Sequence, residues 1–250
     1  LYCIRPQFFD IREAIETDLV AAGLDITHRK IVWLTETDLQ TLYADEPPSP
    51  YIEATKHYMT RGFSKIGIVS GVDVVQKMVE ITGSSHIPGE NGVETIRARY
   101  GDETPIVFKG VPYYLNPIHR SSTQHEAVIV ADYVLSHIIP RSREEIVADM
   151  IRQLHHDAGL MCVYDRHVRE VVSIADALCR EFGGDRAAVR MSSWLHDIAS
   201  LKSGTKEEHH LRGAEDADAV LRLLEYEESF IAKVHYCIET HRCNAELTSK

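Results

Sequence analysis

The feature that most constrains the fold is a change of local pattern near residue 139. Before that point, short apolar, β-branched runs alternate with stretches whose apolar residues recur at helical spacing. The strand-like runs lie at residues 1–4, 26–34 and 65–70 and within 106–115, and the helical stretches at 11–22, 35–43, 51–60, 72–81 and 122–137. This order predicts a mixed α+β domain around one antiparallel sheet, over residues 1–139.

Beyond Pro140 the strand signal disappears, and the remaining residues 140–250 predict an all-α domain. Ser142 followed by Glu145 is typical of a capping box, so we expect a helix from there to about residue 158. Further helical stretches lie at about 165–182, 186–202, 209–226 and 228–242, with glycines between several of them.

Composition excludes several classes of protein. Lys and Arg total 27 against 38 Asp and Glu, a net charge of −11, which argues against broad nucleic-acid binding. No apolar run approaches the roughly 18 residues of a membrane span. Five cysteines without a CxxC pair favour reduced thiols, so we expect a cytoplasmic protein. Leu1 already opens a strand-like run, so we expect the natural chain to begin earlier.

Four short motifs follow one another through the first domain. They are Ile4-Arg5-Pro6, Tyr58-Met59, Thr95-Ile96-Arg97 and Asn116-Pro117-Ile118-His119. Their order and spacing over roughly residues 1–138 resemble those of nucleoside diphosphate kinase. The resemblance implies a ferredoxin-like antiparallel sheet.

The same resemblance implies roles for individual residues. His119 would be the nucleophile that carries a phosphoryl group, which suits a neutral imidazole. The nucleotide-binding residues would be Arg5 and Arg97 at the phosphates, Tyr43 beside them, Tyr51 at the base and Asn116 at the sugar. Mg²⁺ would enter with the nucleotide. The sequence therefore predicts a nucleotide site in this domain.

Departures from the family pattern leave two interpretations open. Arg5 replaces a lysine, Leu115 an arginine and Arg120 a glycine, while Val130 stands where a glutamate orients the histidine ring. The domain is then either an impaired kinase or a relative that binds nucleotide or serves a structural purpose.

The second domain concentrates histidine, with eight of the 14 His between His155 and His241. Adjacent His196 and Asp197 point about 100° apart on a helix, so both reach one ion only if it lies over the helix end. Imidazole and carboxylate together suit Mn²⁺, Fe²⁺, Ni²⁺, Zn²⁺ or Mg²⁺. With His167 upstream and His209-His210 downstream, the pattern resembles the HD superfamily of metal-dependent phosphohydrolases.

By that resemblance His167, His196 and Asp197 are metal ligands, and His209 is either an acid or a ligand for a second metal. Lys202 and Arg212 would meet substrate phosphate, His241 matches a late histidine of the family, and His155-His156 is interpreted as a helix-end pair. The family's last aspartate ligand has no counterpart after Asp218. We therefore expect the domain to be incomplete at its C-terminus.

Together these features predict a two-domain protein that hydrolyses a phosphoester of a nucleotide or similar metabolite. The kinase-like domain would bind nucleotide and transfer phosphate through His119. The alternative is a non-catalytic nucleotide-sensing or scaffolding module with degraded sites. Expected partners are small phosphorylated molecules and, as a further option, copies of the same chain, but no membrane.

Overall fold

The computed structural model describes residues 1–241 and divides the chain into two compact units, Leu1–Arg141 and Ser142–Lys250. The boundary predicted from sequence, after residue 139, stays a prediction about where the domains separate. Across residues 1–241 no helix combines the length and apolar character that crossing a membrane requires.

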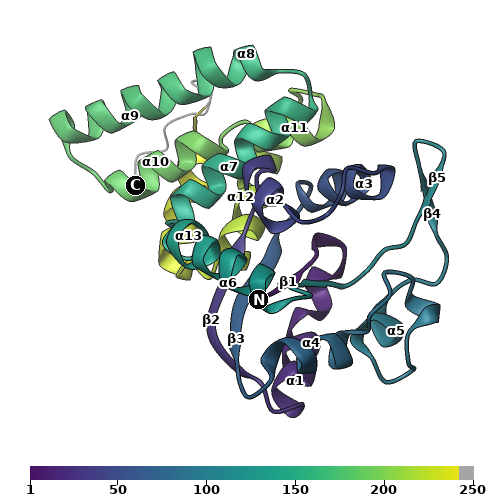
Figure 1. Cartoon of the computed structure of the whole chain (residues 1–250). Coiled ribbons are helices and arrows are strands. Elements are labelled where there is room, and N and C mark those ends of the chain that lie inside the picture. Colours follow the sequence, from purple (N-terminus) through teal and green to yellow (C-terminus); the bar gives the residue numbers. More distant parts are fainter. Residues whose placement is uncertain (242–250) are drawn as a thin grey trace. The chain divides into compact units, whose positions relative to one another are not determined.

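The N-terminal unit is built on a four-stranded antiparallel sheet (Figure 1). Its strands are β1 (Tyr2–Ile4), β2 (Asp25–Val32), β3 (Ser64–Ser70) and β6 (Ile118–Arg120), in the order β2-β3-β1-β6. When these four strands are numbered 1 to 4 along the chain and the sheet is followed from the β6 edge, the order is 4-1-3-2. This is the ferredoxin-like order, so the predicted fold class is confirmed. The sequence analysis missed β6, because three residues are too short a run to show a period.

Helices of the N-terminal unit cover the sheet and its loops. They are η1 (Pro6–Ile11), α1 (Arg12–Ala21), α2 (Glu36–Leu42), α3 (Pro50–Met59), α4 (Val74–Thr82), η2 (Pro88–Glu90), α5 (Ile96–Tyr100), α6 (Gln124–Tyr133) and η3 (Val134–Ile138). A separate hairpin of β4 (Ile106–Phe108) and β5 (Val111–Tyr113) replaces the single strand expected there.

Side chains alternate between the two faces of the sheet, so the apolar core and His119 lie on opposite faces. Tyr2, Ile4 and Ile118 contribute to the main apolar core together with residues of α1 and α4. Cys3 pairs with His119 across the β1–β6 ladder. Each of the two is one position along its strand from a core residue. Since successive side chains point to opposite faces, His119 lies on the face away from the main core.

A buried carboxylate fixes the end of the N-terminal unit. Asp38 is fully buried at the start of α2 and accepts two hydrogen bonds from the Arg141 guanidinium, one of them 2.9 Å long. The Tyr133 hydroxyl donates to the same carboxylate at 2.8 Å, and Thr35 completes a capping box with it. Asp38 therefore ties the last residues of this unit to its second helix.

The C-terminal unit contains only helices among its described residues. They are α7 (Arg143–Asp157), α8 (Met161–Val163), η4 (Tyr164–Val168), α9 (Arg169–Phe182), α10 (Arg186–Leu195), α11 (Ile198–Ser203), α12 (His209–Leu223) and α13 (Glu228–Glu239). The capping box of Ser142 and Glu145 is confirmed at the start of α7. Residue 242, predicted to end the last helix, lies outside the described residues.

Two local departures from a regular helix occur in this unit. The single helix expected over 186–202 is wrong, because the backbone leaves helical geometry at Asp197 and separates α10 from α11. η4 is a π-helical turn inside the continuous rod formed by α8, η4 and α9 (Figure 1). Such bulges re-aim side chains and are frequent at functional sites.

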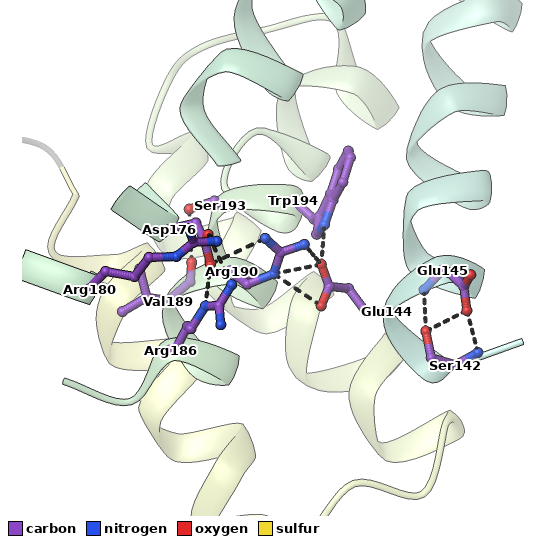
Figure 2. Close-up of polar contacts among 10 residues, drawn as sticks. All are labelled: Ser142, Glu144, Glu145, Asp176, Arg180, Arg186, Val189, Arg190, Ser193 and Trp194. Atoms are coloured by element: carbon purple, nitrogen blue, oxygen red, sulfur yellow. Dashed lines mark hydrogen bonds and ion pairs between the residues drawn. The ribbon is translucent and has the colours of Figure 1, made fainter. Parts of the chain in front are cut away.

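A second buried carboxylate joins helices of the C-terminal unit (Figure 2). Asp176 of α9 accepts hydrogen bonds from Arg186 of α10 and from Arg180 one turn along its own helix. Arg190 lies 3.3 Å from Asp176 and donates to Glu144 of α7, which also accepts from the Trp194 indole at 3.0 Å. The network therefore links α7, α9 and α10 through charge-assisted bonds.

We expect Gly67→Ala to destabilise the N-terminal unit. A Cβ there would lie 2.5 Å from the ring of Tyr2 and 2.6 Å from the carbonyl oxygen of His28, so strand or ring must move. The expected cost is about 1–3 kcal/mol. Urea unfolding followed by Trp33 fluorescence in a Trp194→Phe background measures it. Gly92→Ala, whose Cβ would meet nothing nearer than 3.9 Å, should leave the midpoint unchanged; equal midpoints for both variants would contradict the packing argument.

Asp176→Asn should lower the thermal midpoint of the C-terminal unit at pH 7. The hydrogen bond from Arg186, partly opposed by burial, holds the pKa of Asp176 well below its usual value. A depressed pKa gives stability that is present above the unfolded value of about 4 and is lost as the pH falls below it. The difference in thermal midpoint between wild type and Asp176→Asn should therefore be smaller at pH 2 than at pH 7.

The measurement is thermal unfolding followed by Trp194 fluorescence in a Trp33→Phe background. Asp165→Asn is the matched control, since Asp165 is exposed and lies 3.8 Å from Arg169. Exposed pairs of this kind contribute little. If the difference in thermal midpoint between wild type and Asp176→Asn is the same at pH 7 and pH 2, the ionised carboxylate of Asp176 does not stabilise the unit as expected.

Candidate functional site

One group of side chains in the C-terminal unit, here named the Asp197 cluster, consists of His167, His196, Asp197, His209 and His241. His167 comes from the π turn η4, and His209 is the first residue of α12. His196 and Asp197 occupy the break between α10 and α11. That break removes the 100° divergence expected of adjacent helical residues, so both side chains face one point.

Asp197 lies at the centre of the cluster and uses both carboxylate oxygens. Its Oδ2 is 3.3 Å from Nε2 of His196 and 3.8 Å from Nε2 of His167. Its Oδ1 is 3.4 Å from Nε2 of His209 on the other side. The carboxylate of Asp197 therefore faces imidazole nitrogens on two sides.

The histidine tautomers are set by backbone contacts. Nδ1 of His196 lies 2.8 Å from the carbonyl oxygen of Ser193, and Nδ1 of His209 lies 2.9 Å from that of Lys206. Nδ1 of His241 makes the same kind of contact with Ile238. A carbonyl only accepts, so each Nδ1 carries a proton and Nε2 is the nitrogen left for a metal; without a metal, Nε2 of His196 bonds to Asp197 through a second proton.

The charges within the cluster support one another. Burial alone would raise the pKa of Asp197, but the hydrogen bond with His196 and the neighbouring imidazoles lower it to about 2. Burial lowers the pKa of His196, and Asp197 outweighs this, so the net shift is upward. The carboxylate is therefore ionised at neutral pH, as a metal ligand must be.

The donor set fits a divalent metal. His167, His196 and Asp197 each offer a ligand atom within 4.8 Å of the others, and so do Asp197, His209 and His241. His167 and His196 bring their Nε2 atoms to 3.3 Å, and two lone pairs so close favour a shared cation or proton. Neutral imidazoles and a carboxylate are suitable ligands for the first-row transition metals.

The structure also places residues that the sequence analysis interpreted differently. His155 and His156 lie in the last turn of α7, as expected, but His155 is not a surface residue: it is 2% exposed and packs 5.6 Å from the ring of Tyr164. His241 joins the cluster, as its match to a late histidine suggested. Lys202 donates to Asp216 at 2.6 Å and Arg212 to the backbone of Glu207, so both cations have internal partners.

A second group, the His119 cluster, lies in the N-terminal unit and consists of Arg5, Tyr43, Arg97, His119 and Arg120. His119 is 7% exposed, and its ring centroid lies 4.3 Å from that of Tyr43. Its buried Nε2 and the Tyr43 hydroxyl have no hydrogen-bond partner within residues 1–241. Burial, reinforced by the three arginines, lowers the pKa of His119 well below its usual value, so the imidazole is neutral.

The three arginines of the His119 cluster are buried, and none forms an ion pair with a carboxylate in the described part of the chain. Arg97 donates to the carbonyls of Gly83 and Ser85, at 3.0 and 3.1 Å. Burial and the charges of Arg120 and Arg5 lower the pKa of Arg97 to about 10. Buried cations without counter-ions create a strongly positive site that an anion would relieve.

The remaining predicted nucleotide-binding residues lie beside this cluster. Tyr51 packs against the rings of His86 and Tyr113, at 4.6 and 5.1 Å. Asn116 is buried, and its amide nitrogen lies 3.4 Å from the carbonyl oxygen of His86. Val130 is buried on α6 and adds no polar group, so no carboxylate from that position orients His119.

Comparison with known sequences identifies both units. A sequence model of the nucleoside diphosphate kinase family matches residues 1–138, and one of the HD domain matches residues 164–247. The nucleoside diphosphate kinase of Rickettsia canadensis is 27% identical over 113 residues, 45% of this chain and 74% of the relative. That of Chlamydia pneumoniae is 25% identical over 117 residues, 47% of this chain and 74% of the relative.

Solved structures of the same kind match the N-terminal part. The Aquifex aeolicus nucleoside diphosphate kinase has a TM-score of 0.47 and 20% identity, covering 55% of this chain and 94% of that one. The Halobacterium salinarum enzyme, in complex with CDP, has a TM-score of 0.45 and 20% identity, covering 54% and 83%. From the family matches to its two parts, this chain belongs to the nucleoside diphosphate kinase family through residues 1–138 and carries an HD domain over residues 164–247.

Proposed function

We propose that the HD domain hydrolyses a phosphoester of a nucleotide or similar metabolite, using a divalent metal held by His167, His196 and Asp197. The observation that supports this most directly is the position of Asp197. Its two oxygens face the Nε2 atoms of three histidines at 3.3 to 3.8 Å. A half-buried carboxylate surrounded by imidazole nitrogens is suited to a cation.

A divalent metal at these ligands supplies Lewis acidity to a phosphoryl oxygen and lowers the pKa of water. Of the protein groups, Ser193 and Lys206 hold two of the imidazoles in the tautomer that leaves Nε2 free. The π turn aims His167 at the same point. For His209 two roles stay open: an acid that protonates the leaving group, or with His241 and Asp197 a holder of a second ion.

Asp197→Asn should remove most of the bound metal and lower phosphoester hydrolysis by roughly 100-fold or more. The amide keeps the side-chain shape but has no charge to offer a cation. Elemental analysis after loading with Mn²⁺, Fe²⁺, Ni²⁺, Zn²⁺ or Mg²⁺ measures occupancy. Hydrolysis is followed on a panel of nucleotides and sugar phosphates.

Asp218→Asn is the matched control, because Asp218 pairs with His235 and Arg222 rather than with the cluster. It lies nine residues beyond His209 on α12, about 13 Å along the helix. Full metal content and full activity in Asp197→Asn would contradict the assignment. A wild-type protein that takes up none of these metals would favour the sensing or scaffolding alternative.

We further propose that the kinase-like domain binds nucleotide with Mg²⁺ and transfers a phosphoryl group through His119, slowly. Two observations within the described part of the chain support this: the neutral, buried imidazole with an unpartnered Nε2, and three buried arginines that form no ion pair. The phosphate-binding role falls to Arg5, Arg97 and Tyr43, and the base and sugar to Tyr51 and Asn116.

Slow transfer follows from two missing groups. Without a carboxylate at Val130 the ring of His119 is poorly oriented, and misorientation alone costs roughly 100-fold. Without an arginine at Leu115 the transition state loses one positive contact. Nucleotide binding and transfer can therefore be separated by experiment.

Incubation with a nucleoside triphosphate labelled at the γ-phosphate should leave an acid-labile, base-stable label on the wild-type chain. His119→Gln should abolish it, because the amide cannot form a phosphoramidate. His125→Gln, on the exposed first turn of α6, is the matched control and should keep the label. Label that persists in His119→Gln would refute the assignment, and labelling at a rate normal for the family would refute the expected impairment.

The presence of both domains implies a small-molecule nucleotide partner. We also propose a cytoplasmic location, from the cysteine pattern, and self-association of the chain.

A further inference from the structure

The guanidinium of Arg5 is engaged by tyrosine side chains of its own domain, Tyr113 foremost. Its Nη1 donates to the hydroxyl of Tyr113 at 2.8 Å, while its Nε is buried without a partner. Arg5 is 4% exposed and Tyr113 is 1% exposed. The cation proposed to bind phosphate is therefore already engaged by a neutral phenol.

Tyr113 is held in place by one face of α3. Its ring packs against Tyr51 at 5.1 Å and stacks on Tyr58 at 5.4 Å, and its hydroxyl lies 3.2 Å from Oγ1 of Thr55. These three residues are spaced i, i+4 and i+7, which places them on one side of the helix. The phenol oxygen accepts from Arg5, and it shares a further hydrogen bond with Thr55 in which either hydroxyl can donate.

We infer that Tyr113 is a specificity-determining residue that competes with phosphate for Arg5 and so sets how tightly the kinase-like domain binds its anionic ligand. The inference rests on the proposed nucleotide binding of this domain. Burial, against the opposing charge of Arg5, raises the pKa of Tyr113, so the hydroxyl keeps its proton at neutral pH. A phosphate oxygen that takes the position of Tyr113 at Nη1 replaces that hydroxyl.

Competition follows from what Arg5 gains and loses. A hydrogen bond between a buried guanidinium and a phenol satisfies one donor but leaves the charge without a counter-ion. A phosphate oxygen satisfies both, yet only after Tyr113 gives up its bonds to Arg5 and Thr55. Removing the Tyr113 hydroxyl leaves an Nη1–H of Arg5 without an acceptor in the free protein. An anion then binds without breaking that hydrogen bond.

The test uses Tyr113→Phe in the full chain, which keeps the ring and its stacking and removes the hydroxyl. Calorimetry with inorganic triphosphate, in the presence of a chelator, reports anion binding without a base and without metal in the HD domain. We expect affinity to rise by about tenfold or more, the effect of one hydrogen bond to a charged group. The thermal midpoint of the free variant should be lower than that of wild type and rise more on adding triphosphate.

Two further variants separate this role from a general loosening of the domain. Thr55→Val removes the hydrogen bond between the Thr55 and Tyr113 hydroxyls and should give a smaller gain in affinity. Tyr58→Phe is the matched control, since Tyr58 stacks on Tyr113 but its hydroxyl has no hydrogen bond within the described residues. It should leave the affinity unchanged.

The outcomes distinguish this inference from the proposed function. Affinity that is equal or weaker in Tyr113→Phe than in wild type would overturn competition, and MgADP binding by wild type would then leave the proposed nucleotide site standing. Absence of triphosphate and MgADP binding by both proteins at millimolar concentration would overturn both. Binding by Tyr113→Phe alone would support competition in its strongest form.

Discussion

A charged group that leaves water needs a partner of opposite charge or several hydrogen bonds, and both units depend on how this requirement is met. The C-terminal unit buries Asp176 among three arginines and half-buries Asp197 among histidines. The N-terminal unit buries Asp38 in the same way, with Arg141. Around His119 the pattern reverses, because three guanidiniums are buried there and form no ion pair with a carboxylate among residues 1–241.

This contrast separates structural charges from chemical ones. Asp176 and Asp38 join helices, and their carboxylate oxygens are already used by partners within the protein. Neither carboxylate is therefore left for a ligand. The Nε2 atom of His119 and the Nε atom of Arg5 are not satisfied, although both are buried. Groups of this kind lower the stability of the free protein, and an anion that binds them recovers part of that loss.

Backbone irregularities position the second site. A continuous helix over 186–202 would direct His196 and Asp197 to different sides, and a regular turn would direct His167 elsewhere. The break at Asp197 and the π turn at His167 bring the three side chains together. The Asp176 network joins α7, α9 and α10 (Figure 2), so the geometry of the proposed metal site depends on helices that this salt-bridge network holds together.

The sequence by itself determined the class of each unit and the helix start at Ser142, and it predicted the candidate site residues. These depend on local periodicity, capping and motif spacing, which neighbouring residues encode. Only the tertiary structure decided that Tyr113 engages Arg5, since 108 positions separate them. The burial of His155, the carbonyl contacts of Arg97 and the break at Asp197 likewise depend on packing between segments distant in the chain. Contacts of that range leave no periodic signal, because nothing in the spacing of either partner records the other.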